Sequence, residues 1–171
     1  VKVFGKTHHP KTGKQYMRPR HEAVFGKDYK YSGVTITAET TQNGLVDRVV
    51  AHANVGRDPD TRFTWALCNL YVDGNDNIAF HRDDEKDVRG DEVRTYSFGA
   101  SRKFVMRERA SSAERKRKRD AGEVKPMQGV FMLANGSCGI MRGTAAQTKW
   151  EHGLPKMKRI KRSRISVTPR M

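Results

Sequence analysis

A series of short extended segments, separated by turn signals, limits most strongly what this chain can fold into. Residues 65–71 place Trp65, Leu67, Asn69 and Tyr71 on one face of an extended segment, and a turn sequence follows at 73–76. Further strands are expected at 78–81, 94–98, 102–107, 129–134, 137–142 and 164–168. Many short strands with one early helix predict a mostly β protein, an antiparallel sandwich or jelly roll with the helix on one face.

The helix is predicted over 39–55. Apolar residues recur there at spacings of three and four, and Gly44 weakens the pattern: Leu45, Val46, Val49, Val50 and Ala53. The first 33 residues lack such a pattern and indicate loops or a short hairpin. A length of 171 residues is typical of one domain.

Charge and cysteine content narrow the function classes. The net charge of +15 points to a polyanion, most simply nucleic acid. A mean hydropathy of -0.80 without a long apolar run excludes a membrane span. Two cysteines, Cys68 and Cys138, cannot build a disulfide scaffold or a four-cysteine zinc site, which fits a reducing compartment. The chain opens on Val1 and not on Met, so we expect a trimmed fragment, in which the absence of a targeting segment carries no meaning.

A basic segment, 111–120, interrupts the strand pattern. It carries no core-forming side chain except Ala113, so we expect a solvated loop between two strands. A nuclear address and a phosphate-contacting arm are the other interpretations, and phosphate contact is compatible with the loop.

The strongest chemical signal is the pair His81 and Asp83, which an extended backbone would point to one face. His152, flanked by Trp150 and Leu154, is the best candidate for a third ligand. Two histidines and a carboxylate form the facial triad of non-haem Fe(II) oxygenases. A zinc hydrolase can use the same three ligands, and a surface ion pair is the commoner meaning of this spacing.

A strictly alternating segment at 164–170 bears on that choice. Arg164, Ser166, Thr168 and Arg170 share one face of it. Two guanidinium groups on the inner face of a core strand need an anion, and a small dicarboxylate beside a metal would suit them. An edge strand with solvated arginines is the alternative.

The motifs together resemble the AlkB-type Fe(II)- and 2-oxoglutarate-dependent dioxygenases. The resemblance rests on the shared order of segments 69–71, 73–76, 81–85, 97–102, 135–137, 141–143, 150–156 and 164–170. It implies a double-stranded β-helix with an N-terminal substrate-recognition hairpin or lid. The lid would occupy residues 1–36 and the catalytic core 62–171 of a single domain.

The resemblance also implies roles for individual residues. Fe(II) would be held by His81, Asp83 and His152, with O2 as a further co-substrate. The 2-oxoglutarate site would consist of Asn69, Tyr71, Arg164, Ser166, Thr168 and Arg170. The target base would face Asp84 and Glu85. The N-terminal segment is similar to the branch that repairs duplex DNA, where Phe4 would be a wedge in the base stack. Its neighbours in substrate binding would be Gly5, Lys6, Arg20, Tyr29, Lys30 and Tyr31.

The expected function is therefore oxidative demethylation of 1-methyladenine and 3-methylcytosine in alkylated duplex DNA. The expected protein is a monomer in the nucleus or another DNA-containing compartment. The same chemistry on RNA or protein, or nucleic-acid binding without turnover, are the alternatives. The chain departs from the family at Ser166, where asparagine is usual, and at Pro169, where phenylalanine is usual. The stretches 143–149 and 6–20 are also longer.

Overall fold

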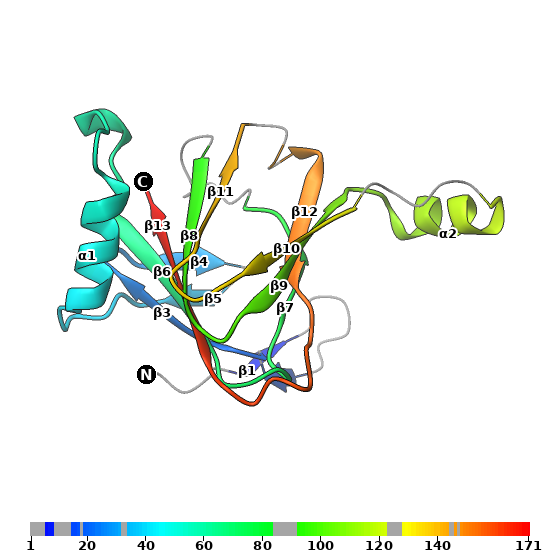
Figure 1. Ribbon diagram of the computed structural model, residues 1–171, viewed down its shortest axis with the longest axis horizontal. Coiled ribbons are helices and arrows are strands. Elements are labelled where there is room, and N and C mark those ends of the chain that lie inside the picture. The colour runs from blue at the N-terminus through cyan, green and yellow to red at the C-terminus, as the bar shows by residue number, and fades with distance from the viewer. Residues whose placement is uncertain are drawn as a thin grey trace.

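The computed structural model describes residues 6–8, 15–17, 19–31, 34–83, 92–122, 128–143, 146 and 148–171. Its body consists of two antiparallel sheets, of five and four strands, and a helix, α1 (Gly44–Ala53), that lies along the outer face of the larger sheet (Figure 1). A second helix, α2 (Ser112–Asp120), projects away from the sheets. The arrangement is the jelly roll that the strand pattern predicts. No helix in the described part of the chain has the length and apolar character to span a lipid bilayer.

The larger sheet has the order β11 (Cys138–Arg142), β8 (Glu92–Gly99), β13 (Arg164–Arg170), β6 (Trp65–Tyr71) and β3 (His21–Phe25). The smaller sheet has the order β10 (Gln128–Leu133), β9 (Arg102–Glu108), β12 (Trp150–Leu154) and β7 (Ile78–His81). Two short hairpin pairs complete the strands, β1 (Lys6–His8) with β2 (Gln15–Met17), and β4 (Tyr29–Tyr31) with β5 (Val34–Ile36). A short 3-10 turn, η1, spans Pro59–Thr61.

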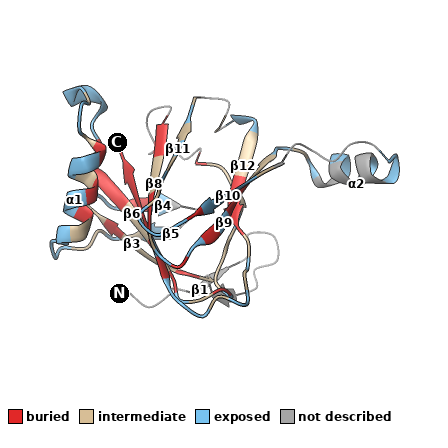
Figure 2. Cartoon of the chain, in the orientation of Figure 1, coloured by how far each residue is buried: buried red, intermediate tan, exposed pale blue. Residues whose placement is uncertain are grey.

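The buried residues are concentrated between the two sheets and beneath α1 (Figure 2). Tyr71, Phe104, Leu133 and Leu154 form an apolar cluster that joins the two sheets. On the other face of the larger sheet, α1 packs its apolar stripe on strands β6, β8 and β13 in a second cluster: Val46, Val49, Ala53, Phe63, Ala66, Tyr96 and Val167. The inner face of the larger sheet is therefore separated from α1 by the sheet itself.

Helix α1 is shorter than the predicted 39–55. The side chain of Asn43 accepts hydrogen bonds from the amides of Leu45 and Val46 and so caps the helix start. Asn54 ends it, because its side-chain amide exchanges hydrogen bonds with the backbone of Phe63. Gly44 lies at the first helical position, outside the helix interior where glycine is most costly.

Two elements differ in kind from the sequence-based expectation. The loop expected at 111–120 is wrong, because residues 112–120 are helical. Ser111 and Glu114 form a reciprocal capping box at its start, and the sequence that follows is rich in good helix formers. Strand β12 is not among the predicted strands, because Gly153 interrupts the apolar pattern of its sequence. A Cβ at Gly153 would lie 2.9 Å from the carbonyl oxygen of Ile78, so the close approach of β7 requires glycine.

The N-terminal region contributes to the larger sheet as well as to separate hairpins. Strand β3, within the residues assigned above to the lid, pairs with β6 along its whole length. Pairs β1–β2 and β4–β5 are separate two-stranded sheets. Phe4 and Gly5 lie outside the described residues.

Gly74 is the contact point between the β6–β7 turn and the segment that connects β12 to β13. Its amide donates to the carbonyl of Ile160, and its carbonyl accepts from the amide of Met157, each at 2.8 Å. A Cβ there would lie 1.9 Å from the carbonyl oxygen of Met157. Because that neighbour is backbone, we expect Gly74→Ala to lower the free energy of unfolding by about 3 kcal/mol or more in urea denaturation.

Gly44→Ala is the matched control, since its Cβ would meet only the side chain of Arg48, at 3.7 Å. That variant should unfold at or above the urea concentration of the unchanged protein. Equal midpoints for the two alanine variants would show that the turn does not depend on this close contact.

Candidate metal centre

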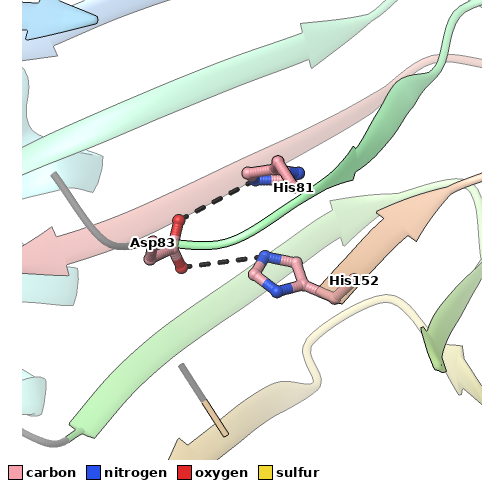
Figure 3. Close-up of side chains that lie close together, drawn as sticks. All are labelled: His81, Asp83 and His152. Carbon is pink, nitrogen blue, oxygen red and sulfur yellow. Dashed lines mark ion pairs between the residues drawn. The ribbon is translucent and has the colours of Figure 1, made fainter. Parts of the chain in front are cut away.

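Three potential metal ligands converge between the sheets, His81 at the end of β7, Asp83 just after it, and His152 on β12 (Figure 3). Their ligand atoms all lie within 4.8 Å of one another. Asp83 lies between the histidines, with one carboxylate oxygen 3.8 Å from His81 Nε2 and the other 3.7 Å from His152 Nε2. Pairing of β12 with β7 brings the histidines together, because His152 lies directly opposite His81.

A backbone carbonyl selects the tautomer of His81. Nδ1 lies 2.9 Å from the carbonyl oxygen of Ala79, which can only accept, so Nδ1 carries the proton. The lone pair of the neutral ring is then on Nε2, the atom that faces Asp83. Such a bond to the distal nitrogen is how proteins orient ligand histidines.

His152 is held as a neutral imidazole. Its ring stacks on Phe104 at a centroid distance of 5.2 Å and lies 4.4 Å from the ring of His81. Burial lowers the pKa of His152 to about 4, and the charge of a protonated His81 acts in the same direction. The ring is thus unprotonated at neutral pH, as a metal ligand must be.

Asp83 is ionised although it is buried. Burial by itself would raise the pKa of its carboxyl group, but Arg170 and the two histidines outweigh that effect and hold the pKa below its usual value. Arg170 Nη2 lies 3.1 Å from Asp83 Oδ1. The centre therefore presents two imidazoles and one carboxylate.

Two arginines on the inner face of β13 are buried without full pairing. Arg164 is 1% exposed and Arg170 4% exposed. Nε and Nη1 of both have no hydrogen-bond partner among the described residues, although Arg164 Nη2 donates to Ser97 Oγ at 2.9 Å. Since β13 is the central strand of its sheet, the edge-strand alternative for these arginines is wrong. Unpaired buried guanidinium donors need an anion.

The other predicted co-substrate residues lie on the same inner face. Register places Tyr71 opposite Arg164 and Asn69 opposite Ser166. The hydroxyl oxygens of Thr168 and Thr95 are 3.5 Å apart. All four predicted residues are at most 6% exposed: Asn69, Tyr71, Ser166 and Thr168. The sheet thus gathers all six predicted co-substrate residues beside the triad, from two strands.

Comparison with known proteins decides the family. The profile of the 2OG-Fe(II) oxygenase superfamily matches residues 2–170. The chain belongs to this superfamily. It is 34% identical to mouse DNA oxidative demethylase ALKBH2 over 98% of its own length and 64% of that protein. It is 30% identical to human alpha-ketoglutarate-dependent dioxygenase alkB homolog 3 over 90% of its length and 51% of that protein. The chain thus spans about two thirds or less of these relatives.

Fold similarity agrees with the family. The solved structure of OsALKBH1 superimposes with a TM-score of 0.55 at 13% identity, covering 90% of this chain and 78% of that one. At that identity the match bears on the fold alone, and it supports the jelly roll.

The residues of this chain fit the groups that the family name implies. Two imidazoles and one carboxylate are the donor set that suits non-haem Fe(II). The orphaned nitrogen donors of Arg164 and Arg170 suit the two carboxylates of 2-oxoglutarate, which accept charge-assisted hydrogen bonds. The predicted cofactors are therefore confirmed at the level of the family, and the role of each residue stays a prediction.

The predicted DNA-contacting residues are more scattered. Lys30 is exposed, whereas Tyr29 is 5% exposed and packs on Trp65 at a ring distance of 5.4 Å. Arg20 is 7% exposed and contacts Asn69. Only the backbone is described for Lys6 and Tyr31, while Asp84 and Glu85 lie outside the described residues.

Two residues that orient this centre are absent from the sequence-based predictions. Phe104 supports His152, and Ser97 binds Arg164. A signal for Ser97 was present, because it lies in the segment 97–102 that shares the family's motif order, and alternation places it with Thr95 on one face of its strand. The stacking of Phe104 depends on the pairing of β9 with β12, which no local pattern specifies.

Proposed function

We propose that this chain is an oxidative demethylase of DNA bases, with 1-methyladenine and 3-methylcytosine as its substrates. One observation carries the proposal: the same site contains the three potential metal ligands and two buried arginines with unpaired nitrogen donors. The chain that holds this site is similar, over nearly its whole length, to relatives named DNA oxidative demethylase.

Different residues of the site have different proposed roles, in metal binding and in co-substrate binding. When bound together, Fe(II), 2-oxoglutarate and O2 would supply an oxidant that hydroxylates the methyl group: 2-oxoglutarate is oxidatively decarboxylated to succinate and CO2, one oxygen atom of O2 enters succinate and the other the methyl group, and the hydroxylated product then releases formaldehyde. His81, Asp83 and His152 would hold the metal. Arg164 and Arg170 bind and orient the dicarboxylate, and burial of both arginines excludes water from the charged contacts. Arg170 also contacts Asp83 and so fixes the orientation of that carboxylate.

The direct test is a balance of products. The protein is incubated with Fe(II), 2-oxoglutarate and an oligonucleotide that carries one 1-methyladenine, and formaldehyde, succinate and the repaired base are measured. We expect the three to appear in equal amounts and all to require Fe(II). Succinate that forms equally with unmodified oligonucleotide, without repaired base, would overturn the assignment of DNA as the substrate.

The basic helix α2 is proposed as a phosphate-binding arm. It carries Arg and Lys at 115–119, and Lys116 and Arg117 are exposed. We expect replacement of residues 115–118 by glutamine to leave the fold intact, since glutamine is also a good helix former. The slope of log affinity for DNA against log salt concentration should fall by about 0.9 for each phosphate that these side chains neutralise. An unchanged slope would assign α2 no part in binding.

Duplex preference is proposed on the basis of Phe4. A wedge offsets the cost of unstacking, which is a few kcal/mol in a duplex and small in a single strand. Phe4→Ala should therefore slow repair of methylated duplex by about ten-fold or more and leave repair of the same lesion in single-stranded DNA nearly unchanged. Equal losses on both substrates would assign Phe4 to the fold. Action as a monomer in a DNA-containing compartment of the cell belongs to the same proposal.

A further inference from the structure

A polar row crosses the inner face of the larger sheet next to the predicted 2-oxoglutarate site. Register places Glu22 of β3 opposite Asn69 of β6, and Asn69 opposite Ser166 of β13. Arg20, immediately before β3, folds over this row. The side chains of Arg20 and Glu22 are each 9% exposed, so this charged pair is buried.

Arg20 determines which way the amide of Asn69 faces. Arg20 Nε donates to Asn69 Oδ1 at 2.9 Å, and Arg20 Nη2 forms an ion pair with the carboxylate of Glu22. A guanidinium has donors but no acceptor, so the amide atom that faces it must be the oxygen. The only side-chain donor of Asn69, Nδ2, is consequently at the opposite end of the amide.

The same contacts place Arg20 beside the co-substrate residues rather than on the outer surface. Asn69 lies two residues before Tyr71 on β6, and Tyr71 lies opposite Arg164. The guanidinium carbon of Arg164 lies 5.3 Å from the centroid of the Tyr71 ring. Burial raises the pKa of Tyr71, while the positive charges of Arg20 and Arg164 act on that pKa in the opposite direction. Glu22 offsets the positive charge of Arg20 in this buried setting.

We infer that Arg20 is a positioning residue for co-substrate binding. It holds Asn69 with Nδ2 directed at a carboxylate of 2-oxoglutarate, and Glu22 holds Arg20 in place. This role rests on the proposed function, because it takes the inner face of the larger sheet as the 2-oxoglutarate site. It differs from the substrate contact that the resemblance implies for Arg20, because the described contacts of this side chain, with Asn69 and Glu22, are inside the protein.

The test measures binding of 2-oxoglutarate by calorimetry to protein loaded with Mn(II), which supports binding without turnover. Glutamine at position 20 carries both a donor and an acceptor, so Arg20→Gln allows the Asn69 amide to turn over. We expect its Kd for 2-oxoglutarate to rise by about ten-fold, as for the loss of one charge-assisted contact. Arg20→Lys keeps a donor-only group and should stay within about three-fold of the unchanged protein. Glu22→Gln should weaken binding by an intermediate factor.

Kinetics separate positioning from a general loss of structure. In the demethylation assay, Arg20→Gln should raise the KM for 2-oxoglutarate and leave kcat at saturating 2-oxoglutarate unchanged, because the contact is made equally in the ground state and the transition state. If Arg20→Gln does not fold, Arg20→Lys and Glu22→Gln carry the test.

A second, partly buried Arg–Glu pair supplies the matched control. Arg57 Nη1 lies 2.9 Å from Glu92 Oε1, with side-chain exposures of 15% and 9%. Glu92→Gln should leave the Kd for 2-oxoglutarate unchanged. Equal effects of Glu22→Gln and Glu92→Gln would overturn the inference, as would an Arg20→Gln variant that loses DNA affinity and keeps its Kd for 2-oxoglutarate. Failure of the unchanged protein to bind 2-oxoglutarate would instead overturn the proposed function, and the inference with it.

Discussion

Replacement of Asp83 by asparagine is expected to abolish Fe(II)-dependent turnover and to weaken metal binding more than about 100-fold. Loss of a group that merely orients a ligand costs about 10- to 100-fold, and Asp83 is proposed as a ligand itself. Asparagine has the same shape as aspartate but no charge, so Arg170 would lose its buried ionic partner. Bound metal can be measured by mass spectrometry after dialysis, and turnover as succinate release. Affinity for DNA should stay within about two-fold, because the phosphate contacts proposed for this chain lie elsewhere.

Glu92→Gln is the control for Asp83 as well. Glu92 is a buried carboxylate, 9% exposed, that accepts from Arg57, Arg94 and Arg142. This substitution also removes a buried negative charge held by arginine, but outside the triad. It should lower stability and leave metal content unchanged. An Asp83→Asn variant that keeps stoichiometric metal would remove Asp83 from the ligand set.

The centre could be predicted largely because strand alternation is local. His81 and Asp83 are two residues apart, and the alternating segment 164–170 places both arginines on one face. The third ligand needed more than alternation, since His152 lies on a strand that glycine disguises. Its flanking residues Trp150 and Leu154 made it the best candidate, and the resemblance in motif order then implied the ligand role. Pairing of β12 with β7 explains why the two histidines meet.

The arrangement around Arg20 could not be predicted in the same way. Arg20 and Asn69 are 49 residues apart in sequence, and their contact depends on the register between β3 and β6. A shift of one residue would turn the side chain of Glu22 to the other face of the sheet. The resemblance therefore implied a part in substrate binding for Arg20, whereas its described contacts are with Asn69 and Glu22. Helix α2 differs from the expected loop for another reason. Its high charge is typical of a solvated loop, and the sequence-based prediction does not include the capping box at its start.

Arg102 and Arg164, which both lie close to the ring of Tyr71, form a natural comparison. Their guanidinium carbons lie 5.6 and 5.3 Å from the centroid of its ring, and both side chains are at most 1% exposed. Arg102 donates to three backbone carbonyls, those of Asp73, Asp76 and Pro155. Arg164 donates to the hydroxyl of Ser97, and burial lowers its pKa. The first arginine serves the fold, and the second is proposed to serve the co-substrate.

Methionine at each position should separate these roles. Arg102→Met leaves three partly buried carbonyls without their donor, so we expect the free energy of unfolding in urea to fall by about 3 kcal/mol or more. Arg164→Met removes a buried cation that lacks full pairing, so the unliganded protein should unfold at an equal or higher urea concentration. The same variant should lose the rise in Tm that 2-oxoglutarate gives the Mn(II)-loaded protein, and its Kd for 2-oxoglutarate should rise at least ten-fold, about 1.4 kcal/mol. Arg164 would be structural if Arg164→Met destabilised the unliganded protein as much as Arg102→Met does and the variant still bound 2-oxoglutarate with unchanged Kd. An anion-binding arginine differs from a structural one in this respect: its replacement weakens ligand binding and does not lower the stability of the unliganded protein.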